Sequence, residues 1–157
     1  MAGLGPVFLD TSVLVAGMVD MGPASAGANR VLDAVAEGLI PEARTAWHCC
    51  METYSVLTRL PAEYKLTAAE AAQLLQNEIL PCVRVFQLPE TAFAGLLAAL
   101  AGERVTGGRV YDVHIAEVAR LAGSGTVLTT NRRHFVSLLS HGIRVLTPEE
   151  FVEHENL

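Results

Sequence analysis

The chain has 157 residues, of which 51% are hydrophobic and 18% are charged, and its mean hydropathy is +0.35. This length predicts one domain over residues 1–157, because domains typically run to about 100–200 residues. The sequence excludes a membrane span, since its longest apolar candidate, residues 92–102, is shorter than the ~18 residues required. No basic stretch precedes an apolar one at the start, which argues against a secretory signal. We therefore expect a compact cytoplasmic protein whose apolar excess belongs to an oligomer or partner interface.

Charge and cysteine content exclude further classes of protein. The net charge of −6 argues against a chain coated in basic residues for nucleic acid. Residues 104–144 nevertheless carry six arginines and two acidic residues, a net +4 that leaves −10 for the remainder. These arginines are either scattered and solvated or form a local anion-facing surface. Three cysteines, of which Cys49 and Cys50 are adjacent, make no disulfide framework, and we expect them to be reduced and buried.

The first elements are a short strand and two helices. Residues 7–9 are uniformly apolar and predict a buried strand that ends at Asp10. Thr11 and Ser12 are able to start the next helix. Apolar residues at helical spacing predict another helix over residues 23–38, which ends in glycine.

A strand and two helices are expected in the middle of the chain. Residues 44–47 predict the second strand, and residues 49–60 predict a helix that Pro61 halts. The next helix, over residues 67–79, opens with T-A-A-E, the pattern of a capping box in which two side chains bond the first turn reciprocally.

The following segments continue the alternation of strand and helix. Residues 83–88 alternate apolar and polar side chains as a third strand does. Residues 89–100 predict an alanine-rich helix with its proline in the first turn. The Gly-Gly pair at 107–108 breaks the chain before a mostly apolar helix over residues 110–121.

Two strands and a final helix complete the predicted fold. The strands are expected at residues 126–129 and 144–146, and residues 147–150 form a second capping box, with proline at the first helical position. Strands separated by helices imply a mostly parallel sheet covered on both faces. The fold class is therefore a three-layer α/β/α sandwich.

In such sheets the functional residues gather at the carboxyl ends of the strands. Asp10 follows the first strand directly, and residues 129–131 follow the fourth. Taken singly, Asp10 could cap a helix, Glu52 could be solvated, and Asp112 could be stabilised by the positive end of its helix dipole. Together they matter because each lies near an element terminus that this topology can bring to one sheet edge.

Four segments then establish a resemblance to a known family. FLDTSVLVAG, METYSVLTRL, VYDVHIAEVARLAG and VLTTNRRHF resemble, in this order, the successive motifs of PIN-domain nucleases, and are most similar to VapC toxins of toxin–antitoxin pairs. The resemblance covers residues 7–146 and implies an acidic catalytic cluster at Asp10, Glu52 and Asp112. The family's commonly acidic fourth position falls on Asn131. The resemblance also implies a metal-dependent endoribonuclease, a homodimer, and an antitoxin that inserts a basic side chain among the carboxylates.

Phosphodiester hydrolysis explains why an active site at this sheet edge would contain carboxylates. A divalent cation activates water and offsets the charge of the transition state. Mg²⁺, with Mn²⁺ as an alternative, is usually held by one or two carboxylates plus phosphate oxygens. We expect Asp10 and Asp112 to be direct ligands, and Glu52 to be a ligand or to hold water at the metal. Three hydroxyls are expected to hydrogen-bond these carboxylates from outside: Thr11, Ser12 and Thr129.

The departure at Asn131 changes the expected metal count. An amide can ligate through oxygen but adds no charge, so one tightly held metal is more credible than two. We expect His134 to be a partly exposed structural histidine and not a general acid or base. His114 lies two positions from Asp112 on one helix and should face away from it.

The arginines that follow Asn131 gain a role beside this site. We expect Arg132 and Arg133 to hold flanking phosphates of single-stranded or loop RNA, because guanidinium groups contact phosphate bidentately. Arg109 and Arg59 are weaker candidates, since either could pair with an acidic residue.

Two alternatives stay open. A phosphatase of the haloacid-dehalogenase kind also places Asp after its first strand, but the second Asp of that motif is Ser12 here. The other alternative is a PIN-like fold kept as a catalytically weak or inactive RNA- or protein-binding module, which the change at Asn131 would suit.

Overall fold

A computed structural model describes residues 4–157 and contains a five-stranded sheet in which every pair of neighbours is parallel. The strand order is β3-β2-β1-β4-β5. The strands are short and lie at β1 (Val7–Leu9), β2 (Ala43–Ala46), β3 (Arg84–Phe86), β4 (Thr126–Leu128) and β5 (Arg144–Leu146). The order runs outward from the central β1 in both directions, so the carboxyl end of β1 lies at the point where the order reverses, the position at which parallel α/β sheets bind ligands.

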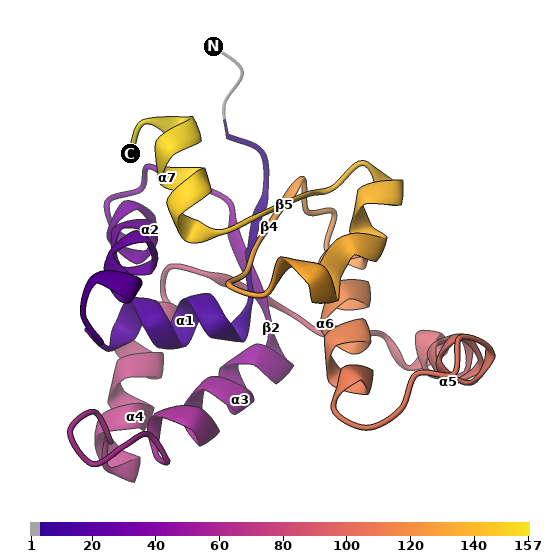
Figure 1. Cartoon of the computed structure of the whole chain (residues 1–157), viewed down its shortest axis with the longest axis horizontal. Helices are drawn as coiled ribbons and strands as arrows, with labels where there is room; N and C mark the ends of the chain where they lie inside the picture. Colours follow the sequence, from indigo (N-terminus) through magenta and orange to yellow (C-terminus); the bar gives the residue numbers. More distant parts are fainter. Residues whose placement is uncertain (1–3) are drawn as a thin grey trace.

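Helices cover both faces of this sheet, which confirms the predicted α/β/α sandwich (Figure 1). One side carries α1 (Thr11–Met18), α2 (Ala26–Ala36) and α7 (Pro148–Glu155). The other carries α6 (Arg109–Leu121) and the 3₁₀ segment η4 (Arg132–His141).

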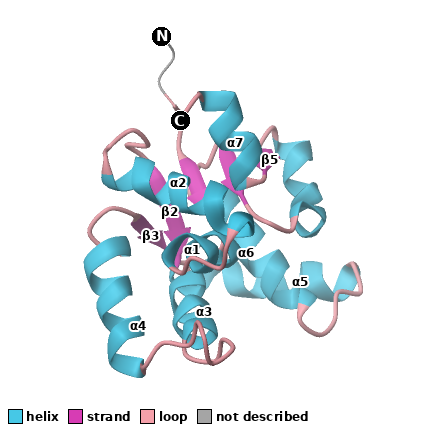
Figure 2. Ribbon diagram, turned by 60° about the vertical axis from the view of Figure 1, so that its left-hand side comes forward, coloured by secondary structure: helices cyan, strands magenta, loops and turns pink. Residues whose placement is uncertain are grey.

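The remaining helices lie beyond these two layers. Helix α3 (Trp47–Leu57) leaves the carboxyl end of β2 and lies beside α4 (Ala68–Leu74), and α5 (Phe93–Gly102) stands apart at the side of α6 (Figure 2). Three short segments complete the fold: η1 (Pro23–Ser25), η2 (Leu75–Ile79) and η3 (Glu90–Ala92).

The core is built around β1, whose three residues are all buried. Helix α1 lies close against α2 because Gly17 has no side chain. A Cβ at this position would lie 2.5 Å from Leu32 Cδ1 and 2.9 Å from the Ala28 carbonyl oxygen. This close approach fixes α1, and with it the turn that carries the residues after Asp10.

Most predicted elements are present, with different limits. The expected strand at 44–47 ends at Ala46, because Trp47 already begins α3, and α3 ends at Leu57, before residue 60. Both capping boxes form as predicted, at Thr67 with Glu70 and at Thr147 with Glu150.

The helix after Thr67 and the third strand differ from expectation in detail. The last turn of the helix, η2, is a π-helix and not a continued α-helix. Strand β3 covers three residues where residues 83–88 were expected, because only Arg84–Phe86 pair with β2. Pro89 is the N-cap of η3 and not a residue of its first turn.

The segment between β4 and β5 is helical, which the sequence reasoning did not predict. Phe135 and Leu138 are buried on one side of η4. A spacing of three residues places side chains on one face of a 3₁₀ helix or of an α-helix, so two such residues alone are too short a pattern to predict a helix.

The cysteine prediction is wrong for one of the three thiols. Cys49 and Cys50 are buried on α3, but Cys82 is exposed in the turn that leads to β3. A lone turn cysteine has no helical or strand face to bury. Over residues 4–157 no helix combines the length and apolar character needed to cross a membrane.

Candidate active site

A cleft of about 480 Å³ opens at the carboxyl ends of β1 and β4. Its walls come from the start of α1, from η1, from α3 and α6, and from the segment that follows β4. The polar side chains that line it are Asp10, Thr11, Ser12, Ser25, Glu52, Asp112, Thr130, Asn131 and His134. The topology therefore brings the three predicted carboxylates and the predicted amide to one place.

Asp10 is the most buried of these carboxylates, with 7% of its surface exposed. Its Oδ2 accepts hydrogen bonds from Ser12 Oγ at 2.9 Å and from Thr129 Oγ1 at 2.8 Å. Burial raises the pKa of Asp10, the two hydroxyl donors lower it in part, and the charge of Glu52 raises it further. The carboxyl makes no side-chain capping bond to α1, so the helix-cap interpretation is not supported.

Ser12 and Thr129 also fix the end of β4. Ser12 Oγ accepts the Thr130 amide at 3.0 Å, and Thr129 Oγ1 accepts the Asn131 amide at 3.0 Å. The two hydroxyls lie 3.5 Å apart. They therefore hold Asp10 and the backbone before Asn131 in one hydrogen-bonded unit, which is the supporting role that the sequence predicted for them.

Glu52 is held by a hydroxyl from the first strand's end. Thr11 Oγ1 donates to Glu52 Oε2 at 2.9 Å, across 41 residues of sequence. His48 Nε2, one turn earlier on α3, lies 3.7 Å from the same oxygen. The side chain of Glu52 is 39% exposed, so its carboxylate reaches the cleft from a solvated wall.

Asp112 has a partner that the sequence reasoning set aside. His134 Nδ1 lies 2.9 Å from Asp112 Oδ2, and the side-chain nitrogen of Asn131 lies 2.9 Å from the same Nδ1. His134 is partly exposed, as expected, but it belongs to the cleft and contacts a predicted metal ligand. The signal for it was the spacing of three residues from Asn131, which places both on one side of a 3₁₀ turn.

The cleft fits a hard divalent cation by the chemistry of its donors. Three carboxylates and an amide are oxygen ligands of the kind that Mg²⁺ prefers. Glu52 lies near enough to Asp10 for its charge to raise the pKa of that carboxyl, a repulsion that a cation would relieve. Within residues 4–157, no three His, Cys, Asp or Glu side chains are already drawn together as a metal-holding group. The cleft thus contains side chains of the kinds that bind a divalent cation, while the carboxylate of Asp112 contacts His134.

The predicted RNA-binding arginines lie outside the cleft lining. Arg132 Nη1 forms an ion pair with Glu150 Oε1 at 2.9 Å, between two side chains that are both largely solvated. Arg133 is exposed on η4, directly after it. The weaker candidates, Arg109 and Arg59, are exposed as well.

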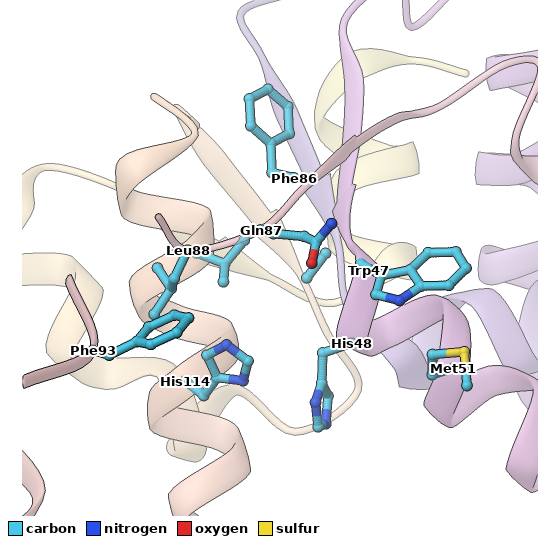
Figure 3. Close-up of a pocket in the computed structure, with 10 residues that line it drawn as sticks. Trp47, His48, Met51, Phe86, Gln87, Leu88, Phe93 and His114 are labelled. Atoms are coloured by element: carbon cyan, nitrogen blue, oxygen red, sulfur yellow. The ribbon is translucent and has the colours of Figure 1, made fainter. Parts of the chain in front are cut away.

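A second depression, of about 300 Å³, lies on the other side of α3 and α6. Figure 3 shows His48 opposite His114, with Phe93 and Leu88 on the side of His114 and with Trp47 and Met51 beyond His48. His114 therefore faces away from the cleft of Asp112, as predicted. Burial lowers the pKa of His114, and the neighbouring His48 lowers it further.

A family of domains and two ribonucleases are similar to this chain in sequence. The chain matches the PIN domain family over residues 7–138. It is 32% identical over 115 residues to Ribonuclease VapC40 of Mycobacterium tuberculosis, a match covering 73% of this chain and 79% of the relative. It is 35% identical over 114 residues to Ribonuclease VapC27 of the same organism, covering 73% of this chain and 77% of the relative.

Solved structures agree on the fold. PAE2754 from Pyrobaculum aerophilum superposes with a TM-score of 0.62 at 14% identity, over 99% of this chain and 97% of that one. The Mycobacterium tuberculosis toxin VapC20, described as cleaving the Sarcin-Ricin loop, superposes with a TM-score of 0.56 at 20% identity, over 77% and 86% of the two chains. The match to the family and to its sequence relatives, on the sheet and cleft described above, shows that this chain belongs to the PIN-domain family.

Proposed function

We propose that this protein is a divalent-metal-dependent endoribonuclease that hydrolyses phosphodiesters in single-stranded or loop RNA, and that it acts as the toxin of a toxin–antitoxin pair. The observation that carries the proposal is the meeting of Asp10, Glu52 and Asp112 in one polar cleft, with hydroxyls holding two of them. The two sequence relatives, both named ribonucleases, support the choice of RNA as substrate.

Asp10 and Asp112 would hold Mg²⁺ or Mn²⁺, which supplies charge to offset the developing negative charge of the phosphate. The protein's own groups supply the rest of the chemistry. Glu52 Oε2, which accepts a hydrogen bond from Thr11, would accept a proton from the water molecule that attacks phosphorus. Ser12 and Thr129 keep Asp10 in one orientation, so that the cleft is preorganised before substrate arrives.

Arg133 is the more available of the two arginines for a flanking phosphate. Arg132 would first have to leave Glu150, although an exposed ion pair of this kind is worth only about 0–1 kcal/mol. Phosphate contacts from either residue would position RNA without reading its sequence.

A partner and a second copy complete the proposal. An antitoxin with a basic side chain would satisfy the carboxylates of the cleft, and the acidic remainder of the chain suits a basic segment. A homodimer would cover the exposed apolar residues around the second depression. These residues are Trp47, Met51, Phe93, Leu97 and Tyr111.

Cleavage of a panel of structured RNAs, with and without Mg²⁺ or Mn²⁺, tests the activity. We expect metal-dependent fragments with defined ends from the parent protein and none from Asp112→Asn purified in the same way. Equal cleavage by the variant would reveal a contaminating nuclease and overturn the proposal.

The same panel decides the alternative of a binding module without catalysis. That alternative is favoured by Asn131, whose amide adds no charge to the site and is engaged by His134. RNA retained in a gel-shift assay but never cut, at any metal concentration, would support it.

A further inference from the structure

The contact between Asp112, Asn131 and His134 brings three possible metal ligands together. His134 Nδ1 lies 2.9 Å from Asp112 Oδ2 and 2.9 Å from the terminal amide atom of Asn131, while His134 Nε2 lies 3.3 Å from that amide atom. All three side chains line the cleft, and those of Asp112 and His134 are 28% and 29% exposed. They are thus reachable from solvent but held in place.

The chemistry of the amide decides what this contact means. A neutral imidazole nitrogen that donates to Asp112 cannot also accept from the Asn131 NH₂ group. An atom this close to both ring nitrogens lies over the face of the imidazole, where the Asn131 NH₂ group can donate to the ring. Asp112 Oδ2 and His134 Nδ1 are therefore the two atoms that remain as neighbouring ligands.

The spacing of these atoms is that of neighbouring ligands around one cation. For metal–ligand bonds of about 2.1 Å in an octahedral shell, adjacent ligand atoms lie about 3.0 Å apart. The distance of 2.9 Å from His134 Nδ1 to Asp112 Oδ2 matches this value. A cation bound to both atoms would lie to one side of the line that joins them and would take the place of the proton between them.

We propose that Asp112 Oδ2 and His134 Nδ1 are neighbouring ligands of the divalent cation, and that this nitrogen ligand makes the protein bind Mn²⁺ in preference to Mg²⁺. The inference rests on the proposed function and names the metal class of that same cleft. Mg²⁺ favours oxygen ligands throughout, whereas neutral imidazole is a common ligand of transition metals. His134 thus takes the place of the carboxylate that Asn131 lacks.

Pulsed electron paramagnetic resonance of Mn²⁺ bound to the full chain tests the ligand directly. We expect a nitrogen modulation typical of coordinated imidazole, which changes when only the histidines carry ¹⁵N. His134→Gln should lose it, and His114→Gln, a matched change in the second depression, should keep it. Bound Mn²⁺ without nitrogen modulation in the parent would overturn the proposal and leave His134 as a hydrogen-bond partner of Asp112.

Metal affinities measured by calorimetry supply a second readout. The parent should bind Mn²⁺ more tightly than Mg²⁺. His134→Gln should lose about 10-fold or more in Mn²⁺ affinity, the usual effect of removing a group around a metal, with a much smaller change for Mg²⁺. Equal affinities of the parent for the two ions, or no binding of Mn²⁺, would refute the inference.

The RNA panel separates this result from the proposed function. Metal-dependent cleavage without a nitrogen ligand would leave the nuclease standing and remove His134 from the metal. A nitrogen-coordinated Mn²⁺ in a protein that never cuts RNA would keep His134 as a metal ligand and overturn the proposed nuclease activity.

Discussion

The same two helices, α3 and α6, line both depressions, yet the two depressions differ in chemistry. On the cleft side they present Glu52 and Asp112. On the other side they present Met51 and Val118, together with the imidazole rings of His48 and His114. Residues adjacent in sequence, such as 51 and 52, therefore serve unrelated surfaces, because each step along a helix turns the side chain by about 100°. Two amphipathic helices are enough to separate an ionic site from an apolar contact surface.

His48 connects the two regions. It lines the apolar depression, where its ring stacks on Tyr111 at 5.3 Å between centroids and meets His114 edge-on at 5.2 Å. Its Nε2 also lies 3.7 Å from Glu52 Oε2 in the cleft wall. A partner that covers the apolar side would thus contact a side chain that borders Glu52.

The largest expected effect is on the cleft side. Asp112→Asn should reduce RNA cleavage more than about 100-fold, because even groups that only support a metal ligand cost about 10–100-fold. Met51→Leu changes the apolar side of α3, one residue from Glu52. This variant should cleave RNA at the same rate as the parent. Initial rates on one RNA substrate measure both, with circular dichroism to show that each variant is folded.

On the apolar side, Leu97→Glu should break the proposed homodimer. Leu97 is 67% exposed on α5, so a charge there costs the folded monomer little but would be buried between two copies. Light scattering after size exclusion should give twice the monomer mass for the parent and the monomer mass for the variant. A parent that is already monomeric would show that this surface does not join two copies.

Support for the cleft should matter less than its ligands. Thr129→Val keeps the shape of a fully buried side chain but removes the donor to Asp10 and the acceptor for the Asn131 amide. We expect roughly 10-fold slower cleavage and a stability loss of about 1–3 kcal/mol, since the buried Asp10 carboxylate and the partly buried Asn131 amide each lose a hydrogen-bond partner. Urea unfolding and initial rates test the two effects separately. Unchanged rates in a folded variant would show that the hydroxyl only stabilises β4.

The smallest effect is a pH dependence that belongs to Asp10 without metal. Because burial raises the pKa of this carboxyl, the folded protein binds a proton where the unfolded chain has released it. The metal-free parent should therefore lose stability as pH rises from the ordinary aspartate pKa to the raised one. Asp10→Asn should lack this loss, so its advantage in melting temperature is full above the raised pKa and shrinks as the pH is lowered towards the ordinary aspartate pKa. A constant difference in melting temperature between the parent and Asp10→Asn at all pH values would contradict this prediction.

Local patterns in the sequence predicted the parts of the fold that local rules control. The apolar run before Asp10, the two capping boxes and the helical spacing of α6 all appear where expected. The gathering of Asp10, Glu52 and Asp112 also followed, because parallel topology brings strand ends together. The 3₁₀ helix η4 was not predicted, since its two buried residues are too short a pattern to indicate a helix.

Contacts between distant segments were beyond such rules. His134 reaches Asp112 through the unpredicted η4, and Arg132 pairs with Glu150 of α7, 18 residues further on. His48 is an exception, because it lies one helical turn before Glu52 and so shares a side of α3 with a predicted site residue. The other two contacts depend on packing, which periodicity does not report.

The exposed thiol of Cys82 offers a practical handle on the assembly of this protein. Burial raises the pKa of Cys49 to about 12 and that of Cys50 to about 11, so neither forms the reactive thiolate near neutral pH. Cys82 is exposed at the amino end of β3, on the sheet edge opposite the cleft. A maleimide dye or spin label should therefore attach selectively to Cys82 of the unaltered chain. Each copy would then carry one reporter remote from the carboxylates, and label-to-label distances would show how the copies are arranged without engineering a cysteine.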